Sequence, residues 1–189
     1  MTPLGCRIRK AFFDGTPVRL DWNVTQQVLE DGTLVLGARA GPEREASNLV
    51  HEMSHLVEID DSRIREPGWG LQTRTIYVGG RICLEPLTIQ GIEREIRVMA
   101  YQANVMARLG MPDEPPVGAM VFMPDFINVP LEDGTPPFTE DGKQTDLDYQ
   151  GIERSRIRWI AHQVETARNV YTYARFEAEW QRKVSLLTS

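Results

Sequence analysis

The sequence predicts an α+β fold, and three observations support this class. The first forty residues contain short apolar runs rich in β-branched and aromatic side chains, which favour strands. Residues 42–59 and 89–109 carry apolar side chains at helical period. The 189 residues, 41% hydrophobic and 25% charged, suit a single domain over residues 1–189. We therefore expect one small mixed or mostly antiparallel sheet packed on the first helix, with further helices C-terminal to it.

The expected strands lie in four segments of the N-terminal half. Residues 7–13 and 18–24 have the composition of single strands. Residues 28–36 read as a hairpin because two apolar runs flank an Asp-Gly dipeptide. Residues 75–84 read as a second hairpin around a Gly-Gly dipeptide.

The expected helices follow the strands. The first runs over 42–59, and the second runs over 89–109 and stops before a glycine and a proline. Residues 111–145 are rich in Pro, Gly and Asp, so we expect a long loop or lid there, with one strand candidate at 120–123. Residues 147–187 form a C-terminal helical segment that is long enough to be broken in two.

Composition narrows the classes of partner. The net charge is -6 and the pI about 5.2, which argues against non-specific nucleic-acid binding because that needs a basic patch. No apolar run reaches signal-peptide length or the roughly 18 residues of a membrane span. We therefore expect a cytoplasmic protein with neither a nucleic-acid nor a membrane partner.

One segment of the first expected helix contains side chains that can bind a metal and transfer a proton, namely His51-Glu52-Met53-Ser54-His55. Histidines four residues apart share a helix face, so both imidazoles can reach one ion at the roughly 2.0–2.1 Å zinc–nitrogen distance. Glu52 lies beside that face, where its carboxylate can hold a water molecule and take its proton. The segment predicts a Zn2+ site on His51 and His55 that serves hydrolysis, with Glu52 as the catalytic general base.

A catalytic zinc needs a third protein ligand, and the second expected helix offers one. Glu95 is the first candidate, and it shares a helix face with Val98 and Gln102. Glu93 is the alternative on the same helix, because the phase of the helix decides between the two. Both glutamates also suit an ordinary first helical turn, where acidic side chains are favoured.

Three further residues are candidates for the site. Asp61 lies ten residues after His51, a spacing that resembles the HExxHxxGxxH/D pattern of the metzincins, although Glu58 stands where that pattern has glycine. His162, the third histidine of the chain, is an alternative ligand, an oxyanion stabiliser or a structural residue. Tyr101 is a candidate hydrogen-bond donor to the oxyanion, or a half-buried aromatic.

HExxH followed by a glutamate on the next helix resembles the gluzincin clan of zinc peptidases, in its compact, zincin-like form. The resemblance covers between a quarter and a third of the chain. It implies zinc on His51, His55 and Glu95, with Glu52 as the base that helps zinc-activated water to cleave a peptide or protein substrate. It also implies that residues 33–39 form an edge strand, along which the extended substrate binds.

Two other functions share these residues. A zinc amidase that acts on a non-peptide bond uses the same groups. A non-catalytic protein-binding module of the same fold holds its zinc structurally or has none, and it does not need Glu52. A structural zinc has four protein ligands, whereas a catalytic zinc keeps one position open, so the ligand set discriminates between these classes.

Overall fold

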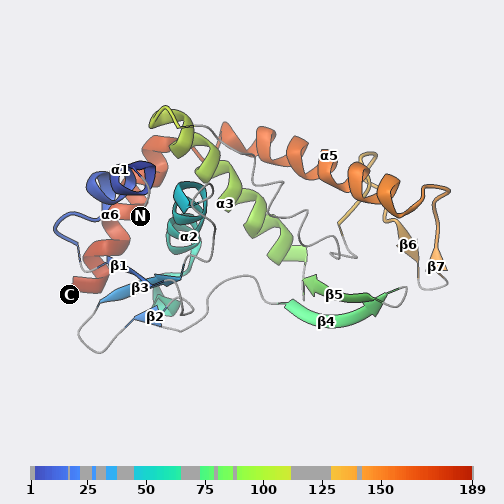
Figure 1. Ribbon diagram of the computed structural model, residues 1–189, viewed down its shortest axis with the longest axis horizontal. Helices are drawn as coiled ribbons and strands as arrows, with labels where there is room; N and C mark the ends of the chain where they lie inside the picture. Colours follow the sequence, from blue (N-terminus) through green and yellow to red (C-terminus); the bar gives the residue numbers. More distant parts are fainter. Residues whose placement is uncertain are drawn as a thin grey trace.

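The computed structural model describes residues 3–16, 18–21, 27–28, 33–37, 45–64, 73–78, 81–86, 89–111, 129–139 and 142–188. In chain order the elements are α1 (Pro3–Phe12), β1 (Val18–Asp21), β2 (Gln27–Val28), β3 (Leu34–Gly37), α2 (Glu45–Glu58), the 3-10 turn η1 (Asp61–Arg63), β4 (Thr73–Val78), β5 (Arg81–Pro86), α3 (Ile89–Arg108), β6 (Phe138–Thr139), β7 (Gly142–Lys143), α5 (Tyr149–Arg168) and α6 (Tyr173–Thr188) (Figure 1). The strand expected at 120–123 lies outside these ranges.

The α+β prediction is wrong, because the described part of the chain is mostly helical (Figure 1). Five α-helices of 10 to 20 residues dominate it. The strands have two to six residues and fall into three separate small sheets, in place of the one sheet that we expected on the first helix. The helices bury their apolar stripes against one another, so this part of the core does not need a sheet to cover it.

Helix α1 replaces the strand predicted at 7–13. Ile8 and Phe12 are buried one helical turn apart on the same face, and Phe13 is buried beside them. Phe13 stacks on Trp180 of α6 with ring centroids 5.6 Å apart, and Trp180 Nε1 donates a hydrogen bond to the Phe12 carbonyl oxygen over 3.2 Å. A short apolar run does not distinguish a strand from a buried helix, and here the packing of α6 decides.

The other strand predictions are largely confirmed. The two expected hairpins are the antiparallel pairs β2–β3 and β4–β5, and β1 lies parallel to β3. The strand order β1-β3-β2 makes β3 central, so the prediction that residues 33–39 form an edge strand for the substrate is wrong. A short unpredicted hairpin, β6–β7, lies within the segment 111–145 that we expected to be a loop.

The helix predictions for 42–59 and 89–109 are confirmed by α2 and α3. Gly110 follows α3 with a φ of +61°, a left-handed conformation that glycine adopts without strain and that commonly ends helices. The C-terminal segment is broken in two, as its length indicated, with α5 and α6 separated at residues 169–172.

Two hydrophobic clusters share helix α3. The first surrounds α2 and is closed by α1, α6 and the C-terminal half of α3, which contributes Tyr101, Val105 and Met106. The second joins the N-terminal half of α3, through Ile92 and Met99 among others, to α5. In Figure 1, α3 accordingly runs between α2 on one side and α5 on the other.

Candidate metal centre

Helix α2 presents its two histidines to α3. Leu49, Val50, Met53 and Leu56 are fully or almost fully buried in the first cluster, so they fix the rotation of α2 about its axis. This rotation directs His51 and His55, four residues apart, toward α3, against which α2 packs. The local helix thus supplies the spacing of the two imidazoles, and core packing supplies their direction.

Three side chains that can bind a metal meet between α2 and α3. His51 Nε2 lies 3.1 Å from His55 Nε2. The carboxylate of Glu95 on α3 spans the pair, with Oε2 3.4 Å from His51 Nε2 and Oε1 3.3 Å from His55 Nε2. We call His51, His55 and Glu95 the triad. This group could hold a metal ion.

The burial of the triad leaves one polar atom, Glu95 Oε1, for which a metal ion would account. The side chains of His55 and Glu95 are 6% and 8% exposed, while that of His51 is 20% exposed. Glu95 Oε1 and His55 Nδ1 are buried and have no hydrogen-bond partner among the described residues. A buried carboxylate oxygen without a partner is costly, and coordination to a cation would satisfy it.

The charges of the triad are strongly coupled. Burial raises the pKa of Glu95, but the neighbouring His55 and His51 outweigh it and hold this pKa well below its ordinary value. Burial lowers the pKa of His51, but the hydrogen bond and charge of Glu95 outweigh it and raise this pKa to about 9. Burial lowers the pKa of His55 to about 4.

Glu52 lies on α2 next to His51 and is partly buried. Burial raises its pKa to about 7, against the charge of His51, which lowers it, and with that of Glu95, which also raises it. A carboxylate whose pKa lies near neutrality can both accept and return a proton. Glu52 therefore remains the candidate for the general-base role predicted for it.

Two residues that the sequence did not single out for a site role complete the surroundings of His51. Gln102 on α3 accepts a hydrogen bond from His51 Nδ1 over 3.0 Å, and its Nε2 donates to Ser47 Oγ on α2 over 2.5 Å. Gln102 lies seven residues, or about two turns, after Glu95, and Ser47 lies one turn before His51. This spacing was the available signal, but it has meaning only once the two helix faces are known to meet.

The alternative ligands do not join the triad. Glu93 is exposed on α3 and His162 is exposed on α5. Asp61 accepts hydrogen bonds from Arg182 and Lys183 of α6, at a different place on the molecule.

Tyr101 and Glu58 also have partners away from the triad. The ring of Tyr101 packs against those of Tyr171 and Phe176, at centroid distances of 5.2 and 5.8 Å. The carboxylate of Glu58 accepts a hydrogen bond from Arg97 Nε over 2.6 Å, which links α2 to α3.

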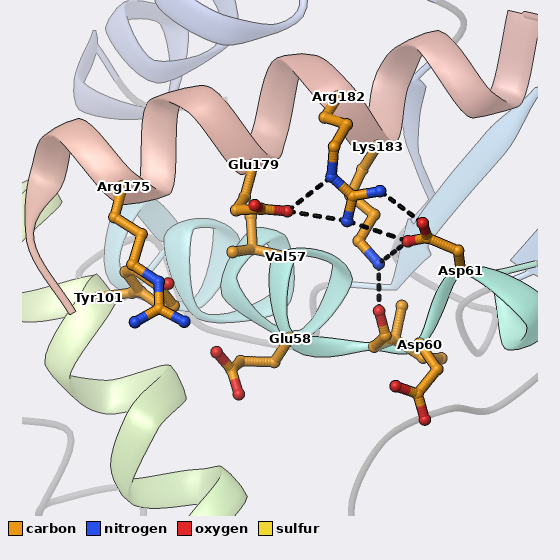
Figure 2. A pocket seen from close by; sticks show the side chains of 10 residues that line it. Val57, Glu58, Asp60, Asp61, Tyr101, Arg175, Glu179, Arg182 and Lys183 are labelled. Carbon is orange, nitrogen blue, oxygen red and sulfur yellow. Dashed lines mark hydrogen bonds and ion pairs between the residues drawn. The ribbon is translucent and has the colours of Figure 1, made fainter. Parts of the chain in front are cut away.

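A pocket of about 450 Å³ lies at the C-terminal end of α2, where α6 crosses it (Figure 2). Its lining includes Tyr101, Asp61, Arg175 and Lys183 but no member of the triad. Figure 2 shows that its walls are held by ion pairs between α6 and the residues that follow α2. The pocket therefore belongs to the junction of these two elements.

None of the described helices combines the length and the apolar character needed to cross a membrane. Comparison of the chain with protein-family models, with curated proteins and with solved structures finds no match.

Proposed function

We propose that the protein is a zinc-dependent hydrolase that cleaves a peptide bond. The observation that carries this proposal is the convergence of His51 Nε2, His55 Nε2 and the Glu95 carboxylate at separations of 3.1 to 3.4 Å. Tetrahedral coordination with zinc–ligand bonds of about 2.0–2.1 Å requires ligand atoms roughly 3.3–3.4 Å apart. The two imidazole nitrogens, 3.1 Å apart, are close to that spacing, and each lies 3.3–3.4 Å from one oxygen of the Glu95 carboxylate.

The ligand set favours a catalytic site over a structural one. Structural zinc sites have four protein ligands, whereas catalytic sites have three and keep one position open. Within the described ranges, the triad gathers no fourth His, Cys, Asp or Glu. This difference supports the enzyme over the non-catalytic binding module.

The triad and Glu52 have separate roles in the proposed hydrolysis. Zinc, when bound, lowers the pKa of a water molecule and polarises the scissile carbonyl. The triad holds the ion and neutralises one of its charges through Glu95. Glu52, beside the triad but outside it, takes the proton from the attacking water and passes it to the leaving amine. The resemblance of this arrangement to the gluzincins supports a peptide as substrate.

The first test is the zinc content of purified protein after zinc reconstitution, measured by elemental analysis. We expect one zinc per chain in the wild type and in Glu52→Gln, and none in His51→Ala. His162→Ala is the matched control, because it removes an exposed histidine that lies outside the triad. Wild-type protein without zinc would overturn the proposal.

The second test separates a peptidase from other zinc hydrolases. The zinc-loaded wild type and Glu52→Gln are incubated with a proteome-derived peptide library, and new peptide termini are identified by mass spectrometry. We expect cleavage by the wild type only. Cleavage by both proteins would remove Glu52 from the mechanism. Zinc binding without any cleavage would overturn the peptidase proposal and leave a zinc site with another use.

A further inference from the structure

The two histidines of the triad differ in what holds their outer nitrogen. His51 Nδ1 meets the side-chain carbonyl of Gln102, whereas His55 Nδ1 has no hydrogen-bond partner among the described residues. His51 is also the more exposed of the two, so burial restrains its ring less. It is thus the ligand that has more need of a second contact.

The contact between His51 and Gln102 depends on how the facing sides of α2 and α3 are aligned. Ser47, His51 and His55 follow one another at four-residue intervals along α2, while Glu95 and Gln102 lie seven residues apart along one face of α3. At one level Glu95 faces both histidines, and further along Gln102 lies between His51 and Ser47. The side chain of Gln102 is buried, with 2% of its surface exposed.

The hydrogen bonds determine which nitrogen of His51 is available to a metal. A neutral imidazole has one N–H, and a metal binds only the other nitrogen. The Gln102 carbonyl requires the hydrogen on Nδ1, which leaves the Nε2 lone pair directed at the triad. In the structure Ser47 Oγ accepts from the amide N–H of Gln102, which leaves the carbonyl end of the amide facing His51. The reversed amide would favour a hydrogen on Nε2, and that tautomer cannot bind a metal through Nε2, the nitrogen that faces the triad.

We propose that Gln102, oriented by Ser47, is a positioning residue that fixes the tautomer and the ring direction of His51 for metal binding. The proposal deepens the zinc function above and rests on it. Groups that accept a hydrogen bond from a metal-ligating histidine commonly change metal affinity by roughly 10- to 100-fold when they are removed. Gln102 touches neither the metal nor the substrate in this role and acts through His51.

The affinity test compares three substitutions by zinc titration against a chromophoric chelator. Gln102→Leu removes the acceptor, and we expect zinc to dissociate roughly 10- to 100-fold more readily. Gln102→Glu keeps an acceptor and is expected to stay within a few-fold of the wild type. Asn104→Leu is the matched control, because Asn104 joins α3 to the C-terminal end of α5 and the turn after it, through the carbonyl oxygens of Arg168 and Tyr171. It should leave zinc affinity unchanged.

The second readout needs no zinc. In metal-free protein with 15N-labelled histidine, long-range proton–nitrogen spectra report the protonation of each ring, and the chain has only three histidines. The Gln102 carbonyl can accept from Nδ1–H in both the neutral and the protonated ring, so we expect this hydrogen to exchange slowly with solvent in the wild type and in Gln102→Glu, and rapidly in Gln102→Leu. Should Gln102→Leu fail to fold, Ser47→Ala provides the test, with a weaker Nδ1–H signal and a smaller loss of affinity expected.

The outcomes separate the two proposals. Wild-type protein that shows the protected Nδ1–H but binds no zinc would overturn the zinc function. Wild-type protein that binds zinc, with affinity and tautomer unchanged in Gln102→Leu, would overturn the positioning role alone.

Discussion

Glu93 and Glu95 of α3 lie only two positions apart in the sequence, but their surroundings in the structure are different. Two residues turn an α-helix by about 200°, so Glu93 and Glu95 lie on nearly opposite faces. Glu95 is buried between the two histidines and Glu93 is exposed. Their carboxylates are chemically identical, so the pair isolates the effect of position on metal binding.

We expect Glu95→Gln to weaken zinc binding by more than about a hundredfold, because loss of a ligand should cost more than loss of a group that only orients one. Glu93→Gln should bind zinc as the wild type does. Isothermal titration calorimetry of both variants measures the difference. Equal losses would mean that the negative charge of the helix matters rather than ligation, and a loss confined to Glu93→Gln would exchange the two assignments.

At the scale of elements, the carboxylate of Asp61 forms ion pairs that link α6 to the end of α2 (Figure 2). Asp61 lies 2.5 Å from Arg182 Nη1 and 2.6 Å from Lys183 Nζ. Lys183 is almost fully buried and also donates to the carbonyl oxygen of Ile59, just beyond the C-terminal end of α2, where the helix dipole favours a cation. Asp61 therefore links α6 to the end of α2 through ion pairs, and it does not lie with the metal ligands.

The ion pairs of Asp61 predict that the stability of the fold depends on pH. Hydrogen bonds from Arg182 and then Lys183 hold the pKa of Asp61 below its ordinary value. A lowered folded-state pKa stabilises the fold above the unfolded-state pKa of about 3.9, and this stabilisation is lost as the pH falls further. We expect Asp61→Asn to melt at a lower temperature than the wild type at pH 7, with a gap that narrows below about pH 4.

Thermal unfolding followed by circular dichroism from pH 3 to pH 7 measures this gap. Asp60→Asn is the matched control, since Asp60 borders the same pocket but forms no side-chain cap on η1. It should change the melting temperature little. A gap for Asp61→Asn that is as wide at pH 3 as at pH 7 would show that the charge of Asp61 does not cause the stabilisation.

At the scale of the whole molecule, α6, near the C-terminus of the chain, packs against α1, near the N-terminus of the chain (Figure 1). Phe176 is fully buried, and its ring contacts those of Phe12, Tyr101 and Trp180. We expect Phe176→Ala to lower the free energy of unfolding by about 3–5 kcal/mol, measured by urea denaturation. Val170→Ala, at a position 57% exposed, should change it by less than about 0.5 kcal/mol. Similar losses in both variants would contradict this account of the core.

The sharing of α3 by the two hydrophobic clusters predicts one cooperative unfolding transition for the expected single domain. Trp180 lies in the first cluster and Trp159 packs against the second. In protein labelled with 5-fluorotryptophan, the fluorine resonances of these two residues should disappear at the same urea concentration. The assignments come from Trp159→Phe and Trp180→Phe. Separate midpoints would mean that the clusters unfold independently.

The features that the sequence by itself determined are local ones. The four-residue spacing places His51 and His55 on one face of α2 with Glu52 beside them, wherever that helix lies. Helical period likewise predicted α2 and α3, and the turn dipeptides predicted both hairpins, because these signals depend only on residues a few positions apart.

Only the tertiary structure decided the rest, because it depends on which faces meet. The burial of α3 selects Glu95 over Glu93, and the register of α2 against α3 brings Gln102 to His51. The packing of α6 makes a helix of the segment that the sequence assigned to a strand, and with it the class of the described part changes from α+β to mostly helical. A local pattern specifies the face of an element, whereas the partner of that face lies far away in the sequence and is chosen by burial of the whole chain.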